Sequence, residues 1–176
     1  MSDQLAGKTA VITGGGRGIG RSIAIAYAEA GADIALVSRT KEQLDEVAGE
    51  IEKTGRKAVP IPTDLTDRAQ VQSMAEEVKN AFGTIDILVN NAGGGIEKRS
   101  ILESEPDVWV QDVTVNLISV YLVTHALLPL MIEGGGGHII NMGSGAGHSS
   151  APSGCAYRVG KAGQWMFTRC LAEEVW

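Results

Sequence analysis

Residues 9–20 read TAVITGGGRGIG, and this stretch decides the expected fold. The apolar run that ends at Thr13 predicts a short buried strand, and the glycines predict a turn with unusual backbone angles. A helix follows, with one apolar stripe at helical spacing that consists of Ile19, Ile23, Ala26 and Tyr27. The first turn of such a helix offers unpaired N–H groups and a positive dipole end to a phosphate. The stretch therefore favours a dinucleotide ligand, although glycine-rich turns also occur in ordinary loops.

The rest of the chain alternates short apolar runs with longer helical patterns. Strands are predicted at residues 9–13, 33–38, 57–62, 85–90 and 138–142. Helices are predicted at residues 18–30, 41–54, 67–82, 107–132 and 154–174. This alternation is typical of βαβ units, so we expect one α/β domain with a doubly wound parallel sheet and helices on both faces.

Composition narrows the classes of function. With 176 residues, of which 44% are apolar, the chain can bury one sizeable core. A formal net charge of −6 without blocks of Lys and Arg disfavours nucleic acid and anionic membranes as partners. The sequence shows neither a leader peptide nor an apolar run of membrane-spanning length, so we expect a cytoplasmic location and a small soluble substrate.

The cysteines and histidines do not form a metal-binding pattern. Cys155 and Cys170 lie in or beside a predicted helix, which favours small buried thiols over a disulfide. The histidines at positions 125, 138 and 148 lack companions at the spacing of zinc ligands. We therefore expect no metal.

The glycine turn has the pattern T-G-x-x-x-G-x-G, with Gly14, Gly18 and Gly20 at its fixed positions. This pattern differs from the G-x-G-x-x-G of other dinucleotide-binding proteins and resembles that of the short-chain dehydrogenase/reductase family. Further signatures of this family follow in the same order and cover essentially the whole chain. The resemblance implies a Rossmann-type domain that binds a nicotinamide cofactor and acts as an oxidoreductase.

The end of the second predicted strand indicates which cofactor is bound. An NAD enzyme usually presents a carboxylate about 20 residues beyond the glycine turn, whereas this chain has Ser38 and Arg39 there. Ser38 removes a charge that would repel the 2′-phosphate of NADP, and Arg39 can bind that phosphate, with Arg17 as a second positive charge. The sequence therefore favours NADP(H). The alternative is that both arginines are solvated surface residues.

The resemblance implies further cofactor contacts after the third and fourth strands. Asp64 matches the family position that meets the adenine amino group, and residues 90–93 resemble the N-N-A-G segment that lines the cofactor. Within that segment we expect Asn91 to steady the central sheet. Together the predicted cofactor-binding residues are Gly14, Gly16, Arg17, Gly18, Ile19, Gly20, Ser38, Arg39, Asp64, Leu65, Asn91, Ala92, Gly93, Tyr157 and Lys161.

The predicted chemistry centres on Tyr157 and Lys161, which have the Y-x-x-x-K spacing of the family. This spacing places both on one helical face, where an ammonium favours the phenolate form of a tyrosine. Ser144 lies 13 positions upstream of Tyr157, at the end of the fifth strand, where the family has its catalytic serine. Asn116 matches the fourth active-site residue, whose implied role is to bind a water that links Lys161 to solvent. The alternative is a buried asparagine that satisfies a helix kink.

The resemblance then implies a mechanism without a metal. The nicotinamide gives a hydride to a carbonyl carbon while Tyr157 donates a proton to the oxygen, and alcohol oxidation runs these steps backwards. Ser144 would polarise the carbonyl and stabilise the developing negative charge. Lys161 would also hold the nicotinamide ribose.

The charges near the ends of the long helices bear on the substrate. Reductases of acyl groups on an acidic carrier protein need basic residues there, but this chain has Glu133, Glu173 and Glu174. Arg158 and Arg169 weaken this argument without reversing it. A small carbonyl or alcohol compound is therefore preferred, and a 3-oxoacyl-[acyl-carrier-protein] reductase is the alternative.

Family members continue beyond the helix that carries Tyr157 and Lys161, whereas this sequence stops at Trp176. We therefore expect residues 1–176 to form a single dinucleotide-binding and catalytic domain without the C-terminal segment that covers the substrate. The chain is either part of a longer protein, which we favour, or a truncated form whose pocket a partner closes. A truncated cofactor-binding module without turnover is the corresponding alternative function.

The two longest predicted helices carry more apolar residues than one sheet face can cover. These residues are Val120, Leu122, Val123, Leu127 and Leu128 on the first helix and Trp165, Met166, Phe167 and Leu171 on the second. In the family such helices pair across a two-fold axis, so a homodimer or homotetramer is expected. The alternative is that these side chains pack inside one subunit.

Overall fold

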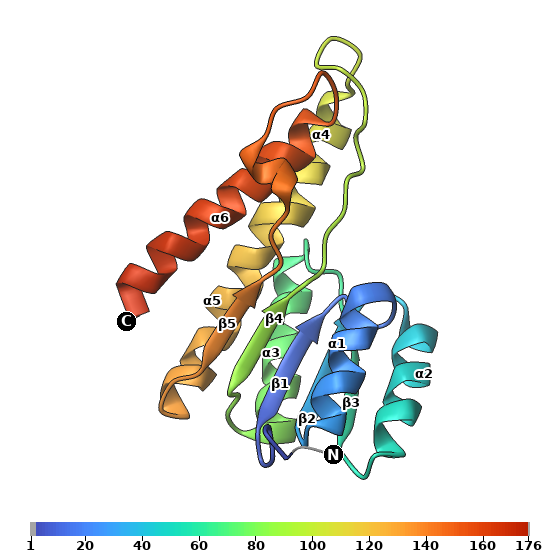
Figure 1. The fold of residues 1–176 in the computed structure, drawn as a ribbon, viewed down its shortest axis with the longest axis vertical. Coiled ribbons are helices and arrows are strands. Elements are labelled where there is room, and N and C mark those ends of the chain that lie inside the picture. Colours follow the sequence, from blue (N-terminus) through green and yellow to red (C-terminus); the bar gives the residue numbers. More distant parts are fainter. Residues whose placement is uncertain (1–2, 176) are drawn as a thin grey trace.

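The computed structural model describes residues 3–175 and contains one sheet of five parallel strands (Figure 1). The strands are β1 (Thr9–Thr13), β2 (Asp33–Ser38), β3 (Ala58–Pro62), β4 (Ile87–Asn90) and β5 (His138–Asn141). Their order in the sheet is β3-β2-β1-β4-β5, and every neighbouring pair is parallel. The predicted doubly wound sheet is confirmed. Its strand order reverses beside β1, which is where folds of this kind bind ligands.

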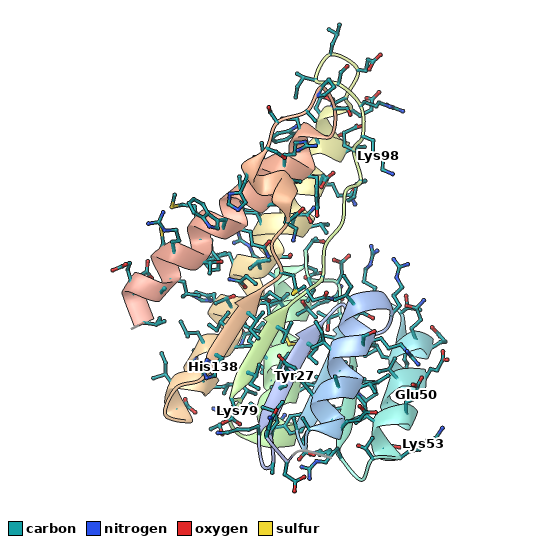
Figure 2. The ribbon with its side chains drawn as sticks, in the orientation of Figure 1. Tyr27, Glu50, Lys53, Lys79, Lys98 and His138 are labelled. Atoms are coloured by element: carbon teal, nitrogen blue, oxygen red, sulfur yellow. The ribbon has the colours of Figure 1, made fainter. Side chains whose placement is uncertain are left out.

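Helices cover both faces of this sheet (Figure 1). They are α1 (Gly18–Glu29), α2 (Lys41–Glu52), α3 (Arg68–Phe82), α4 (Pro106–Val113), α5 (Ser119–Glu133) and α6 (Cys155–Val175). One core, to which Ala24 and Leu44 belong, lies under α1 and α2, and a second core with Val78 and Leu127 lies under α3 and α5. β1, β2 and β4 are almost completely buried between these layers. An ion pair of 2.6 Å between Arg21 and Glu50 links α1 to α2. Glu50 lies on α2 (Figure 2).

The predicted stripe of α1 is not the face that packs on the sheet. The buried residues of α1 are Gly20, Ala24 and Ala28, whereas Ile19 is 64% exposed. The cause is steric, because a Cβ at Gly20 would overlap the carbonyl oxygen of Gly14. Only small residues let the helix approach this closely, so Ile19 turns outward, whereas Ile23 and Tyr27 are half-buried and pack against the core from beside it.

The long helix predicted at residues 107–132 is interrupted. α4 and α5 are joined by a π-helical segment, η1 (Thr114–Ile118), in which each hydrogen bond spans one residue more than in an α-helix. The continuous stretch Pro106–Glu133 is long and apolar enough to span a membrane, and its most apolar 18-residue window has a mean hydropathy of 1.8. This finding corrects the expectation of no such run, but 44% of the apolar window is buried inside the fold. The buried side of this stretch, which includes Val123 and Leu127, belongs to the core under α3 and α5.

The exposed apolar residues on the long helices match the prediction only in part: Trp165 and Met166 are 44% and 48% exposed, as expected, but other predicted residues are buried. Val120, Val123 and Leu127 are at most 2% exposed and belong to the core of this chain, and Leu171 is also buried. The large apolar side chains that remain exposed on these helices include Val110, Ile118, Tyr121, Ile132, Val159, Trp165 and Met166. The alternative of packing within one subunit thus holds for part of the predicted set.

The side of the sheet that ends in β5 is more open than its centre. β5 forms one edge, and its residues from His138 to Asn141 are exposed or half-buried. Both cysteines are free thiols, as expected, but Cys170 is exposed and Cys155 only half-buried. The prediction of two buried thiols was therefore wrong.

Candidate active site

The glycine turn joins β1 to α1 at the carboxyl edge of the sheet. Gly14 and Gly18 have φ angles of 67° and 56°, in the left-handed region that favours glycine. Within residues 3–175 no side chain caps the first turn of α1, because Arg17 at the N-cap position makes no such bond. The turn therefore presents free N–H groups and the positive end of the helix dipole, as a pyrophosphate requires.

Asn91 ties this turn to the end of β4. Its side-chain Nδ2 donates to the carbonyl oxygen of Thr13 at 2.9 Å, and its backbone N–H donates to Thr13 Oγ1 at 3.0 Å. The backbone N–H of Ala92 donates to the same hydroxyl oxygen at 3.0 Å. A Cβ at Gly14 would lie only 2.8 Å from Asn91 Nδ2. Asn91 thus steadies the centre of the sheet, as its position in the N-N-A-G segment suggested.

Ser38 supplies an unpaired polar atom at the end of β2. Its Oγ is buried and has no hydrogen-bond partner among the described residues. It faces the glycine turn, where a Cβ added at Gly16 would lie 3.1 Å from this oxygen. A buried hydroxyl without a partner is unfavourable unless a ligand supplies the missing bond. A ribose hydroxyl or phosphate oxygen beside the turn would do so, and these residues therefore fit the expected cofactor.

Two positive side chains flank this position. Arg17 and Arg39 are exposed, and neither guanidinium forms an ion pair or hydrogen bond in the part of the chain that the structure describes. Asp64 accepts hydrogen bonds from the N–H and hydroxyl of Thr66. The N–H of Thr66 holds the pKa of Asp64 below its ordinary value, and the charge of Arg39 acts in the same direction. The half-buried side chain of Leu65 packs against the core under α3.

Tyr157 and Lys161 lie one turn apart on α6. Lys161 is 5% exposed, and its Nζ donates to the carbonyl oxygen of Met142 at 2.7 Å and to Gln164 Oε1 at 2.9 Å. Burial lowers the pKa of Lys161 from its ordinary value. The segment after β4 runs beside both side chains. A Cβ added at Gly93 would lie 3.6 Å from Lys161 Nζ, and one added at Gly95 would lie 3.7 Å from Tyr157 Cβ.

Ser144 lies three residues beyond β5 rather than at its end. It is the N-cap of a short 3₁₀-helix, η2 (Gly145–His148), and its Oγ accepts the N–H of Ala146 at 3.2 Å. Ser144 and Lys161 line the same cavity of about 170 Å³, together with Gln164. The structure thus brings the predicted serine and lysine to one site.

Asn116 is fully buried in the π-helical segment, where its side chain holds the loop after β4. Oδ1 accepts the N–H of Gly94 at 3.0 Å, and Nδ2 donates to the Gly94 carbonyl oxygen at 2.9 Å. Nδ2 also donates to Asp112 Oδ1 at 2.7 Å. This arrangement supports the alternative of a buried asparagine in a distorted helix. The implied water-binding role stays a prediction.

Sequence reasoning missed two buried carboxylates that hold the same loop. Asp112 is fully buried, and its Oδ2 accepts the backbone N–H groups of Ile96 and Glu97, each at 2.8 Å. Glu97 is 5% exposed, and the N–H of Arg99 holds the pKa of Glu97 below its ordinary value. For Asp112 the sequence did offer a signal, because this residue lies one helical turn before Asn116 and therefore on the same helical face.

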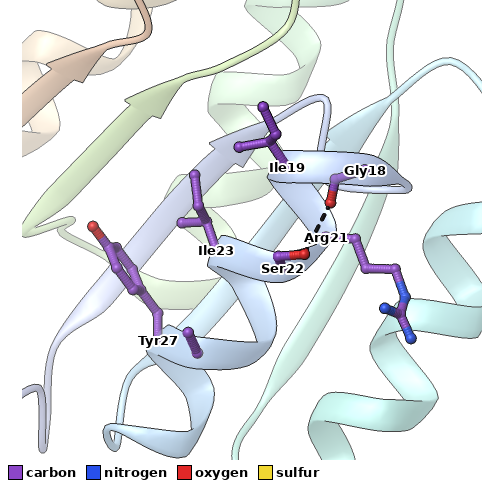
Figure 3. A pocket seen from close by; sticks show the side chains of 7 residues that line it. Gly18, Ile19, Arg21, Ser22, Ile23 and Tyr27 are labelled. Atoms are coloured by element: carbon purple, nitrogen blue, oxygen red, sulfur yellow. Dashed lines mark hydrogen bonds between the residues drawn. The ribbon is translucent and has the colours of Figure 1, made fainter.

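A second, open hollow of about 630 Å³ lies along one side of α1, away from Ser144, Tyr157 and Lys161 (Figure 3). All of its lining residues come from α1, and Ile19, Ile23 and Tyr27 point toward it (Figure 3). It touches the glycine turn only at Gly18 and Ile19, so the candidate reactive side chains lie elsewhere.

Among residues 3–175 no group of three or more His, Cys, Asp or Glu side chains is placed to hold a metal ion.

Comparison with known proteins identifies the family. A family model described as short chain dehydrogenase matches residues 8–176. An uncharacterized oxidoreductase of Mycobacterium tuberculosis is 40% identical over 96% of this chain and 64% of its own length. A metagenomic short-chain oxidoreductase in complex with NADP superposes with a TM-score of 0.93 at 37% identity, covering 98% of this chain and 78% of that one. Carveol dehydrogenase from Mycobacterium avium in complex with NAD superposes with a TM-score of 0.94 at 31% identity, covering 98% of this chain and 67% of that one.

The chain therefore belongs to the short-chain dehydrogenase/reductase family, whose members are oxidoreductases that bind a nicotinamide cofactor. It spans 56 to 64% of the length of the first three relatives it matches. The solved structures contain NAD in one case and NADP in the other, so family membership alone does not decide the cofactor.

Proposed function

We propose that the chain provides the cofactor-binding and catalytic part of an NADP(H)-dependent oxidoreductase that interconverts carbonyl and alcohol groups of a small substrate. The observation that carries this proposal is the burial of Lys161 one turn from Tyr157, with its ammonium held by two neutral oxygens. Lys161 has no carboxylate partner within the described residues. Its positive charge is therefore available to favour the phenolate of Tyr157.

The chain's own residues would move the proton and stabilise charge. In reduction the Tyr157 hydroxyl donates its proton to the substrate oxygen, and in oxidation the phenolate takes it back. Ser144 Oγ already accepts the N–H of Ala146, so its own hydrogen remains free for the substrate oxygen. The nicotinamide, when bound, supplies or accepts the hydride at the substrate carbon.

The preference for NADP(H) rests on the charges around Ser38. Arg17 and Arg39 are exposed without partners among residues 3–175, and a 2′-phosphate would pair with such guanidiniums. The three residues directly after β2 are Arg39, Thr40 and Lys41, so none of them places a carboxylate beside that phosphate. The NADP complex of the metagenomic relative supports this choice, and the NAD complex of carveol dehydrogenase supports the alternative.

A small carbonyl or alcohol compound is the proposed substrate class. Glu133 at the end of α5 and Glu173 and Glu174 near the end of α6 are all exposed, and these carboxylates would repel an acidic carrier protein. Carveol dehydrogenase, by its name, acts on such a small alcohol.

The Tyr157→Phe substitution tests this function. It should reduce NADPH-dependent carbonyl turnover by about 10² to 10⁴-fold, because it removes the proton donor and little else. NADPH binding, followed by cofactor fluorescence, should stay within about twofold of the wild type. Tyr27→Phe on α1 is the matched control and should leave both quantities unchanged. Retention of more than about a tenth of the wild-type rate in Tyr157→Phe would remove this residue from the role.

We also propose a homodimer or homotetramer formed through α5 and α6. The two helices lie side by side, since the rings of Tyr121 and Phe167 meet edge to face with centroids 6.3 Å apart. Tyr121 and Met166 are 46% and 48% exposed, so both helices offer apolar surface to a partner. Light scattering at micromolar concentration should give at least twice the mass of one chain, and Met166→Glu should lower it. A strictly monomeric wild type would refute the interface.

A cytoplasmic location is proposed on composition. The formal net charge is −6, and the strongly apolar helix at Pro106–Glu133 contributes its buried side chains to the core under α5. A fluorescent fusion that partitions with membranes would contradict this location.

A further inference from the structure

α6 carries a third polar side chain on the face that holds Tyr157 and Lys161. Gln164 is 1% exposed, and its Oε1 accepts a hydrogen bond from Lys161 Nζ at 2.9 Å. The three residues occupy positions i, i+4 and i+7 of one helix, which lie on the same face. Gln164 thus belongs to the candidate site by position as well as by contact.

Packing alone does not explain an amide at this position. Gln164 Nε2 is buried without a hydrogen-bond partner in the part of the chain that the structure describes. An unpaired buried N–H is unfavourable, and a methionine of similar length would fill the space without it. What a methionine lacks is the acceptor Oε1. The bond to Lys161 is therefore the interaction that accounts for the amide.

The contacts of Lys161 also restrict the direction of its ammonium. An ammonium has three N–H donors, and two of them are engaged by the Met142 carbonyl oxygen and Gln164 Oε1. These acceptors come from the end of β5 and from α6, so together they orient Nζ from two sides. One donor remains for the reactive groups.

Other charged groups do not take the place of Gln164. The elements that contact α6 contribute the titratable residues Asp107 and Asp112 on α4, Tyr121 and His125 on α5, His148 on η2 and His138 on β5. On α6 itself the titratable or charged residues besides Lys161 are Cys155, Tyr157, Arg158, Arg169, Cys170, Glu173 and Glu174. Within residues 3–175 none of these groups forms an ion pair or hydrogen bond with Lys161.

We propose that Gln164 is a positioning residue, whose Oε1 holds the Lys161 side chain in its charged form and, with the Met142 carbonyl, directs its remaining N–H donor. The effect of Gln164 on catalysis rests on the proposed function, whereas its hydrogen bond with Lys161 is part of the structure whatever the function is. Because burial lowers the pKa of Lys161, an acceptor that opposes this effect keeps the ammonium available over a wider pH range.

The Gln164→Met substitution removes the acceptor and keeps the shape. Titration of the Lys161 side chain in protein with ¹³Cε-labelled lysine, without cofactor, measures the proton affinity, and the signal is assigned with Lys161→Arg. Gln164→Met should lower this proton affinity about tenfold, because a hydrogen bond to a charged group is lost. Gln164→Glu restores an acceptor and adds a negative charge, so it should raise the proton affinity above that of the wild type.

Gln72→Met provides the matched control, since Gln72 is exposed on α3 and far from Lys161 in the fold. It should leave the Lys161 titration unchanged. In activity measurements the alkaline limb of the kcat profile should move to lower pH in Gln164→Met, which a merely structural role would not cause. A loss of packing would instead lower the thermal midpoint while the titration of Lys161 stayed in place.

The outcomes separate this inference from the proposed function. A folded Gln164→Met protein with the wild-type Lys161 titration would overturn the inference. If Gln164→Met does not fold, an unchanged titration in Gln164→Glu would overturn it equally. A shifted titration in a protein whose wild type reduces no carbonyl compound with NADPH would support the role of Gln164 and reject the proposed function.

Discussion

The two ends of the candidate site are shaped by different forces. At the cofactor end, side chains are excluded, because a Cβ at Gly14 or Gly20 would collide with Asn91 or with backbone. At the catalytic end, the backbone N–H groups of the loop after β4 donate hydrogen bonds to the buried side chains of Asp112 and Asn116. One end depends on steric exclusion and the other on buried polar pairing.

This difference decides how each end tolerates change. Steric exclusion fails when atoms are added, and there is little room for relaxation where the added atom meets backbone. Polar pairing fails when one partner is removed, because the groups that remain stay buried and unsatisfied. We therefore expect the cofactor end to be damaged by larger side chains and the catalytic end by the loss of a hydrogen-bonding group.

The largest effect is expected from Gly20→Ala at the cofactor end. The added methyl group would overlap the Gly14 carbonyl oxygen and approach Asn91 Nδ2, so α1 must move away from the turn. We expect the free energy of unfolding to fall by about 1–3 kcal/mol and NADPH binding to be lost. Denaturant unfolding and cofactor titration measure the two effects.

Gly49→Ala on α2 is the control for this prediction. A Cβ at Gly49 meets no atom within 4 Å, so the protein should gain about 0.5–1 kcal/mol of stability from the better helix former. Equal responses of the two variants would show that steric exclusion does not shape the turn.

Much of the cofactor end could be predicted from sequence because its signals are local. The bounds of β1 and β2 agree with the prediction at both ends, since each strand is a continuous buried apolar run. The glycine pattern located the turn between β1 and α1. The buried face of α1 could not be predicted, because apolar periodicity does not show that Gly20 must approach the Gly14 carbonyl.

The catalytic end was predicted only in part because its contacts are long-range. The spacing of Tyr157 and Lys161 is visible in the sequence, but the bond from Asp112 to the N–H of Ile96 joins residues 16 apart through a loop. A buried aspartate or glutamine looks like a surface residue in sequence. Asp112 and Gln164 were missed for this reason, and so was the π-helical segment that places Asn116.

Asp112→Asn tests the polar pairing at the catalytic end. The amide keeps the shape but replaces one accepting oxygen by an N–H₂ group, so the bonds to the N–H groups of Ile96 and Glu97 or to Asn116 must weaken. We expect the free energy of unfolding to fall by about 1–3 kcal/mol. Hydrogen exchange at the amides of Ile96 and Glu97 should become faster than in the wild type.

The same substitution at Asp107, which is exposed in the first turn of α4, serves as the control. It should change stability by less than about 1 kcal/mol and leave the exchange of both loop amides as it is. Protected loop amides in Asp112→Asn would show that the loop is held by its own backbone rather than by this carboxylate.

The smallest effect is expected from charge at the surface of the cofactor end, where Arg39 is exposed and solvent screens its field. Wild-type protein should bind NADPH about tenfold more tightly than NADH, a difference of roughly 1.4 kcal/mol, and Arg39→Asp should reverse the order. Fluorescence titration at two salt concentrations measures this preference, which should shrink as ionic strength rises. Lys53→Asp, at the far end of α2 (Figure 2), changes the net charge equally and should leave the preference intact. Equal affinities in the wild type would mean that Arg39 is a solvated residue, and the cofactor end would then select its ligand by shape alone.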